Sequence, residues 1–162
     1  MSESHGTNEF SHLDEHGAAR MVDVSAKPIS VRSATATGRV LVSSEVVALL
    51  RGSGVPKGDA LAVARIAGIQ AAKRTPDLVP LCHPIAIHGV DIALHVADDH
   101  VSVQATVRTA DRTGVEMEAL TCVAVAGLAL IDMVKAVDPA ATITDVQVVE
   151  KTGGSSGTWR RA

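Results

Sequence analysis

The 162-residue chain contains almost no aromatic side chains: one phenylalanine, one tryptophan and no tyrosine. Both aromatic residues, Phe10 and Trp159, lie close to a terminus. The core therefore has to be built from alanine, valine, isoleucine and leucine, which pack tightly but bury less surface per residue than aromatic rings. A chain of this length forms one domain, and we expect association between subunits to add to its stability.

Charge and hydropathy exclude several classes of protein. The formal net charge is −3, so the chain lacks the basic field of a nucleic-acid-binding protein. The apolar run at 119–131 is bounded by Glu118 and Asp132 and is too short to predict a membrane span. Two cysteines, Cys82 and Cys122, are too few for a secreted disulfide scaffold, and the polar N-terminal segment does not resemble a signal peptide. We therefore expect a cytoplasmic protein.

The order of the expected elements predicts the fold class. Alternating apolar residues predict strands, and helical spacing with capping residues predicts helices. The expected order is a strand at 30–42, helices at 44–51 and 60–73, strands at 90–96 and 101–107, a helix at 115–137 and a strand at 143–150. Apart from one additional helix, this is the βαββαβ order of a ferredoxin-like α+β sandwich with an antiparallel sheet.

The distribution of polar and apolar residues predicts one domain with a tail at each end. Residues 1–20 are polar and lack periodicity, which predicts a disordered tail. Residues 21–157 form the domain, and 158–162 are a C-terminal tail. The whole stretch from Lys151 onwards is rich in glycine and serine, and we expect it to be mobile.

Asp132 and Lys135 are the first candidates for chemistry. They stand three residues apart on the long helix, so the carboxylate and the ammonium are neighbours. On spacing alone a surface ion pair is the favoured interpretation. The alternative is a proton-transfer pair, in which each group tunes the pKa of the other.

The loop Leu81-Cys82-His83 leaves three interpretations open: a thiolate nucleophile, half of a zinc site, or contacts to a ligand. A zinc site needs further ligands at workable spacing, and no second CxxC motif exists, so no metal site is expected. Acidic residues at 116–118 suit the start of a helix. We interpret Cys122, within the apolar helical run, as a core residue.

Five segments of the chain together resemble the cyclic pyranopterin monophosphate synthase family, which acts second on the path from GTP to the molybdenum cofactor. The resemblance covers residues 21–157. The segments are MVDVSAKP at 21–28, KGDALAVARIAGIQAAKRTPDLVPLCHPI at 57–85, TGVEMEALT at 113–121, DMVKAVD at 132–138 and, more weakly, KTGG at 151–154.

This resemblance implies a lyase that rearranges a cyclic dihydro-GTP intermediate to a pyranopterin, closes a cyclic phosphate and releases pyrophosphate. It implies a homohexamer, a trimer of dimers with active sites between subunits. No resident cofactor is implied, and whether Mg²⁺ accompanies the triphosphate stays open.

The resemblance also assigns roles to residues, and it favours the proton-transfer interpretation of the ion pair. It implies that Asp132, Lys135 and Lys57 are catalytic. The implied substrate-binding residues are Leu81, Cys82, His83, Met117, Glu118, Lys151, Arg32 and Lys73. Arg74 remains a surface charge. Glu118 and Asp132 are fourteen residues apart, about 21 Å along a helix, so we infer that each site combines the two helix ends from different subunits.

Two departures from the family pattern affect this assignment. Ser155 and Ser156 stand where the family often has a lysine, so one phosphate contact is lost or supplied elsewhere. Ile131 stands where a tyrosine is frequent, which argues against a phenol beside Asp132.

Three other functions compete with the synthase. A non-catalytic nucleotide-binding regulatory module of the same fold would not need the Asp132–Lys135 pair. An RNA-binding module would need aromatic side chains on its strands, and no expected strand contains one, so we discard it. A thiol enzyme based on Cys82 and His83 is a minor alternative.

Overall fold

A computed structural model describes residues 11–52 and 54–162. The elements of this part of the chain are, in order, β1 (Ser30–Leu41), α1 (Ser44–Arg51), α2 (Ala60–Lys73), α3 (Thr75–Leu78), β2 (Gly89–Val96), β3 (His100–Asp111), α4 (Glu116–Val134), β4 (Thr142–Thr152) and β5 (Trp159–Arg160).

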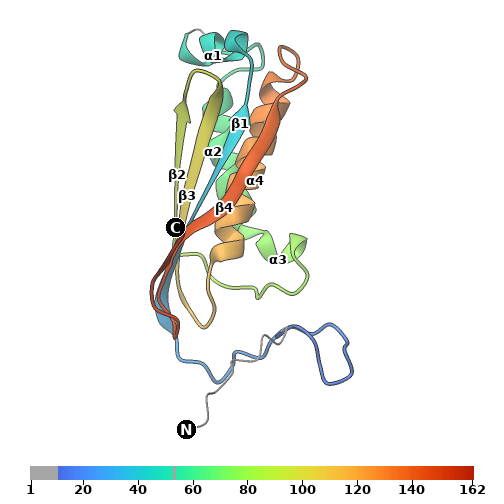
Figure 1. The fold of residues 1–162 in the computed structure, drawn as a ribbon, viewed down its shortest axis with the longest axis vertical. Coiled ribbons are helices and arrows are strands. Elements are labelled where there is room, and N and C mark those ends of the chain that lie inside the picture. The colour runs from blue at the N-terminus through green and yellow to red at the C-terminus, as the bar shows by residue number, and fades with distance from the viewer. Residues whose placement is uncertain (1–10, 53) are drawn as a thin grey trace.

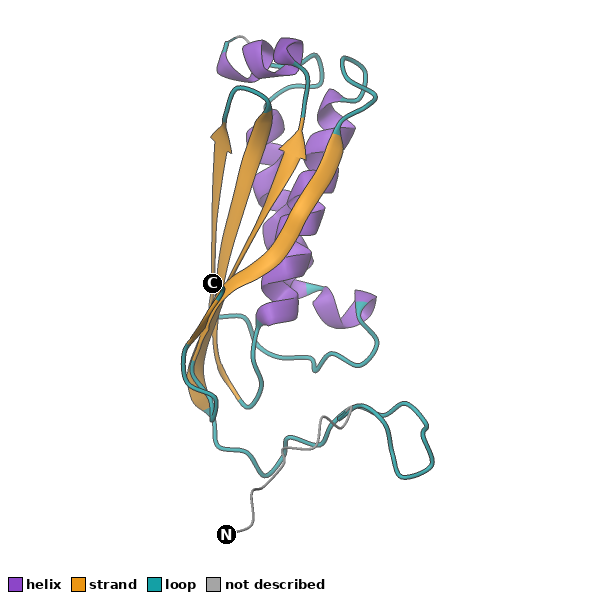
Figure 2. Ribbon diagram, viewed as in Figure 1, coloured by secondary structure: helices purple, strands orange, loops and turns teal. Residues whose placement is uncertain are grey.

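The strands form one antiparallel sheet in the order β2-β3-β1-β4-β5. Helices α2 and α4 cover one face of this sheet, and α1 lies across the end at which β1 stops (Figure 1). Figure 2 shows the same two-layer arrangement of helices and strands. The order of the first four strands confirms the ferredoxin-like α+β fold expected from the sequence.

Small apolar residues allow the helix layer to lie close to the sheet. On β1, Ala36 pairs with Ala105 of β3 on one side and with Val148 of β4 on the other. A Cβ atom at Gly38, further along β1, would lie only 2.7 Å from a methyl group of Val123 on α4. The buried apolar residues among those described are Ala, Val, Ile, Leu, Met and Cys, which confirms a core without aromatic rings.

Helix α4 is the central helix of this core. It is long and apolar enough to cross a membrane by length and composition alone, but half of its most apolar stretch is buried against the sheet and α2, as in a core helix. Cys122 is fully buried there, as expected. The helix ends at Val134 rather than at the expected residue 137. Pro139 has no backbone N–H to donate to the Lys135 oxygen, so the helix cannot continue through this proline.

Helices α2 and α4 pack closely through a glycine. A Cβ atom at Gly68 would lie 2.8 Å from the side chain of Ile92 and 3.0 Å from the backbone oxygen of Cys122. After α2, Thr75 and Pro76 interrupt the helix as expected, but they also begin the short helix α3, which the sequence did not reveal. Proline is well tolerated in such a first turn.

The two chain ends differ from their expected structures. Of the segment 1–20 that was expected to be disordered, residues 1–10 lie outside the described residues. Residues 11–20 contain a turn that is closed by a bridge between Leu13 and Ala19. At the other end, the stretch expected to be a mobile tail contains residues that pair in the sheet. Strand β4 continues to Thr152, and β5 folds back on it after glycines with positive φ angles.

Candidate active site

The residues assigned to chemistry lie at opposite ends of α4. Met117 and Glu118 are in its first turn, Asp132 is in its last turn, and Lys135 is its C-terminal capping residue. The rise of an α-helix separates Glu118 from Asp132 by about 21 Å. One chain therefore presents two separate groups of residues, a charged cluster and a pocket.

The charged cluster is formed by Lys57, Asp132 and Lys135. Lys135 Nζ donates to Asp132 Oδ1 at 2.7 Å, and Lys57 Nζ donates to Oδ2 at 3.2 Å and to the backbone oxygen of Asp132 at 3.0 Å. Lys57 reaches this position from the turn before α2, where the neighbouring Gly58 has a φ of 114°. The structure thus brings together the three residues predicted to be catalytic.

The two lysines determine the charge state of Asp132. Their hydrogen bonds and positive charges hold the pKa of the Asp132 carboxyl below its usual value, so the group is ionised at neutral pH. All three side chains are about half exposed to solvent, so these ion pairs contribute little to stability. The lowered pKa makes the carboxylate a weak base, and its two ion pairs place both ammonium groups side by side as donors toward a bound ligand.

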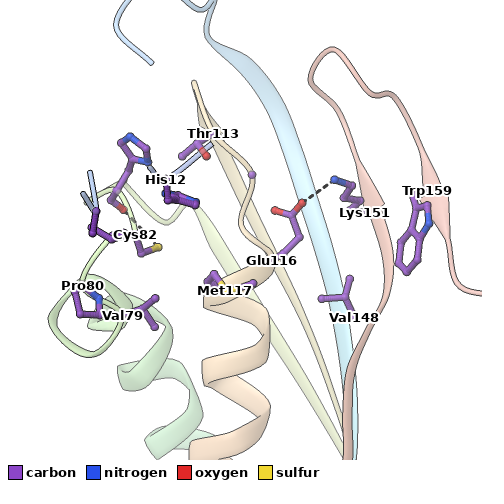
Figure 3. Close-up of a pocket in the computed structure, with 14 residues that line it drawn as sticks. His12, Val79, Pro80, Cys82, Thr113, Glu116, Met117, Val148, Lys151 and Trp159 are labelled. Atoms are coloured by element: carbon purple, nitrogen blue, oxygen red, sulfur yellow. Dashed lines mark hydrogen bonds and ion pairs between the residues drawn. The ribbon is translucent and has the colours of Figure 1, made fainter. Parts of the chain in front are cut away.

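An open pocket of about 1060 Å³ lies at the other end of α4. It is bounded by the loop after α3, the first turn of α4 and the strands β4 and β5 (Figure 3). Its lining residues are His12, Ala19, Val79, Pro80, Leu81, Cys82, His83, Thr113, Gly114, Glu116, Met117, Val148, Lys151 and Trp159.

Five of the residues predicted to bind substrate line this pocket, and three do not. Those in the lining are Leu81, Cys82, His83, Met117 and Lys151. Glu118 is only 1% exposed and lies behind the lining. Arg32 lines an adjoining smaller pocket, and Lys73 is exposed in the last turn of α2, outside both linings.

Cys82 in the pocket lining is partly exposed and is paired with Glu118, which is buried behind it. The Cys82 thiol donates to Glu118 Oε1 at 3.5 Å, whereas Glu118 Oε2 is buried without a hydrogen-bond partner among the described residues. Burial, assisted by the charge of Glu118, raises the pKa of Cys82 to about 11. The sulfur is therefore protonated at neutral pH, which argues against a thiolate nucleophile.

His83 has its orientation fixed by the segment that precedes β1. Its Nε2 donates to the backbone oxygen of Val22 at 2.5 Å, because a carbonyl oxygen can only accept. In the neutral ring Nδ1 is then an acceptor, which suits a ligand with an N–H or O–H group.

A smaller cationic pocket of about 180 Å³ adjoins the first one. The two share Thr113, Gly114, Glu116 and Lys151. The remaining lining residues of the smaller pocket are Lys27, Arg32, Ser33, Arg112, Thr152, Gly153, Ser155 and Ser156. Several guanidinium and ammonium groups around one small cavity provide the charge-assisted donors that phosphates accept.

Glycines bring Arg32 into this cationic pocket. A Cβ atom at Gly153 would lie 2.2 Å from the backbone oxygen of Val31, and one at Gly154 would lie 2.3 Å from an Arg32 guanidinium nitrogen. The turn after β4 therefore packs directly onto Arg32, whose Nε donates to the backbone oxygen of Asp111 at 3.1 Å.

Sequence reasoning missed several residues of these pockets. Lys27 and Arg112 supply cations near Ser155 and Ser156, where the family often has a lysine. Glu116, interpreted only as a favourable helix start, forms an ion pair with Lys151 at 3.0 Å. Lys27 lies within the matching segment 21–28 and Arg112 directly precedes the segment 113–121, a signal that was available. Trp159 carried no such signal, because it lies beyond those segments.

The chain is a ferredoxin-like domain with a lysine–carboxylate cluster and a separate pocket joined to a cationic cavity. This combination defines a class of small α+β enzymes that act on a phosphorylated compound. Residues 21–154 match the model of the MoaC family, and the chain belongs to this family.

Several relatives are similar to this chain over nearly their whole length. A cyclic pyranopterin monophosphate synthase of Streptomyces avermitilis is 68% identical over 155 residues, which are 96% of this chain and 91% of the relative. One from Nocardioides sp. is 63% identical and covers 99% of both chains. Cyclic pyranopterin monophosphate synthase 2 of Mycobacterium tuberculosis is 57% identical over 96% of this chain and 93% of its own length.

Proposed function

We propose that the protein is a cyclic pyranopterin monophosphate synthase, a lyase of molybdenum cofactor biosynthesis. Its reaction converts the cyclic dihydro-GTP intermediate to cyclic pyranopterin monophosphate and releases pyrophosphate. The observation that carries this proposal is the meeting of Lys57, Asp132 and Lys135 in a chain of the MoaC family. A regulatory nucleotide-binding module would have no use for this cluster.

The proposed roles follow from the surroundings of each residue. Asp132, Lys135 and Lys57 exchange protons with the rearranging substrate, supported by the ionised carboxylate between two ammonium groups. The pocket lined by His83 and Met117 receives the ring system.

The substrate phosphates occupy the cationic cavity, which is supported by the cations around it. Arg32 and Lys151 line this cavity together with Lys27 and Arg112. Glu118 acts from behind the lining through Cys82, and Lys73 contacts the ligand only if a neighbouring subunit completes the site.

Each complete site is proposed to combine the charged cluster of one subunit with the pocket of another, in a hexamer built as a trimer of dimers. The separation of about 21 Å between the two helix ends supports this, because one nucleotide-sized ligand cannot reach both on one chain. Apolar side chains on the outer surface of the helix layer, including Ile66 and Leu128, are 59% and 60% exposed and provide area for subunit contacts.

The reaction is proposed to need no metal held by the protein, and any Mg²⁺ would arrive with the triphosphate. In the described part of the chain no three His, Cys, Asp or Glu side chains gather as a metal-binding group. A cytoplasmic location is proposed as well, in keeping with two free thiols, Cys82 and Cys122.

The test of the proposed function compares the wild-type protein with the Asp132→Asn variant. Purified protein is mixed with the cyclic dihydro-GTP intermediate, and pyrophosphate and pterin product are measured. We expect turnover by the wild type and a loss of about 100-fold or more in the variant, because a positioned proton-transfer group is worth that much. Thermal unfolding should change little, since Asp132 is exposed.

Asp98→Asn is the matched control, because Asp98 is also an exposed aspartate paired with a cation, Arg51, at 3.0 Å. This variant should keep wild-type turnover. Binding of the intermediate by the wild type without release of pyrophosphate would contradict the synthase assignment. Full activity of Asp132→Asn would remove only the proposed role of this carboxylate.

A further inference from the structure

Trp159 is the only tryptophan in the chain, and it lies beyond the segment 21–154 that matches the family model. Its indole nevertheless forms part of the lining of the large pocket (Figure 3). The side chain is 41% exposed, so one part of the ring is covered by protein and another is open to the pocket. A half-exposed indole in a concave site is a ready surface for a flat ligand.

The ring is held firmly for a residue so close to the C-terminus. Strand β5 pairs with β4, so that Trp159 lies opposite Lys151. On the following residues, Arg160 Nε donates to Glu150 Oε2 at 2.6 Å, and the Arg161 backbone N–H donates to the Val149 oxygen at 2.9 Å.

Arg161 also contacts the ring itself. Its guanidinium carbon lies 5.5 Å from the ring centroid, and its Nε donates to the Val148 oxygen at 2.7 Å. A cation over an indole face stabilises one ring position. Because Arg161 is not part of the pocket lining, it supports the ring without occupying the space for a ligand.

The surroundings of Trp159 match a ligand that is flat at one end and anionic at the other. Val148 and Met117 continue the apolar wall beside the indole (Figure 3). Lys151, its cross-strand partner, is shared between this pocket and the cationic cavity. One pair of opposed residues therefore presents an indole face and an ammonium group side by side, the ammonium being paired with Glu116 at 3.0 Å.

We propose that Trp159 stacks against the fused ring of the substrate and fixes its position relative to Lys151. This inference rests on the proposed function and adds a residue that contributes affinity for the ring system of the substrate. Stacking on an aromatic side chain tolerates changes of the ring, so Trp159 contributes affinity, whereas hydrogen-bonding groups such as His83 select the ring edge.

Two substitutions of Trp159 test this proposal by steady-state kinetics with the cyclic dihydro-GTP intermediate. Trp159→Leu keeps an apolar side chain but removes the aromatic face, and it should raise KM about tenfold with kcat nearly unchanged. Trp159→Phe keeps an aromatic face and should stay close to the wild type. Arg160→Ala is the control for β5, because it removes the Glu150 contact and leaves the indole in place.

The outcomes separate this proposal from the proposed function. Wild-type protein without turnover would contradict the synthase assignment itself. An active wild type with an unchanged KM in Trp159→Leu would overturn the stacking role alone. Equal increases of KM in Trp159→Leu and Trp159→Phe, with altered oligomer size on gel filtration, would show a packing role instead.

Fluorescence gives a second, independent measurement. Because the chain has one tryptophan and no tyrosine, its emission reports on Trp159 alone. Rapid mixing of the wild-type protein with the intermediate should quench this emission at concentrations near KM. Turnover without any change in emission would overturn the proposal, since a stacked ring cannot leave the indole surroundings unaltered.

Discussion

Glu118 and Asp132 are carboxylates on the same helix, yet their surroundings drive their pKa values in opposite directions. Two ammonium groups lower the pKa of Asp132, which is exposed. Burial raises the pKa of Glu118, which has Cys82 as its one side-chain hydrogen-bond partner in the described part of the chain. Sites that need both a carboxylate and a carboxylic acid commonly separate the two groups in this way.

The raised pKa of Glu118 predicts a pH-dependent stability. In the unfolded chain the carboxyl ionises near its ordinary value of 4.5, whereas in the folded protein it keeps its proton to higher pH. Between these two pKa values the folded state binds more protons, so its stability falls as the pH rises. Glu118→Gln removes this loss, and its free energy of unfolding relative to wild type should increase as the pH rises above the ordinary carboxyl value of 4.5.

Urea unfolding of both proteins across this pH range measures the difference. Glu45→Gln, a change of an exposed glutamate on α1, is the matched control and should show little pH dependence relative to wild type. A constant difference between Glu118→Gln and wild type would mean that Glu118 ionises alike in the folded and unfolded states.

How far single residues could be predicted depends on whether their neighbours are local. Asp132 and Lys135 are three residues apart on a helix, so their contact follows from spacing. Lys57 is 75 residues from Asp132, and its place beside the carboxylate depends on how the start of α2 meets the end of α4. Only the family resemblance, and not the spacing, linked it to the pair.

Among the secondary-structure elements, the hairpin of β4 and β5 does most to build the pockets. It places Lys151 and Trp159 opposite each other and brings the intervening turn against Arg32. Alternation of apolar residues predicted the earlier strands. It could not predict β5, because a strand of two residues after a glycine-serine segment shows no alternation.

The turn of this hairpin predicts a difference between two glycines. Gly153 has a φ of 90°, and a Cβ atom there would overlap the backbone oxygen of Val31 at 2.2 Å. Gly153→Ala should therefore cost about 2 kcal/mol or more and displace Arg32. Gly157 also has a positive φ, 64°, but has no atom within 4 Å of an added Cβ, so Gly157→Ala should cost only about 1 kcal/mol.

Unfolding by urea measures both costs, and the KM for the cyclic dihydro-GTP intermediate measures the effect on the cationic cavity. Gly153→Ala should raise KM, whereas Gly157→Ala should not. Equal stability losses in the two variants would indicate that backbone strain alone matters and that the turn does not need its close contact with Val31.

In the complete fold, α4 is both the main core helix and the element that separates the two functional groups. Its buried face packs against the sheet and α2, so its two ends are held rigidly apart. The sequence predicted this separation from helical rise alone. It could not predict the pocket, which depends on segments that meet only after folding, such as the loop at Cys82 and the C-terminal strand.

The rigid separation predicts that two inactive variants can restore each other. Asp132→Asn disables the charged cluster, and Lys151→Ala disables the pocket at the other end of the helix. If each site combines the two ends from paired subunits, every mixed pair contains one site with both residues intact. Unfolding and refolding an equal mixture should therefore recover about a quarter of wild-type turnover, because half of the pairs are mixed and each has one intact site of two. The variants refolded separately and then combined without exchange serve as the control and should stay inactive. A refolded mixture with no more activity than the separate variants would mean that one chain supplies both ends of its own site, and the proposed arrangement between subunits would have to be abandoned.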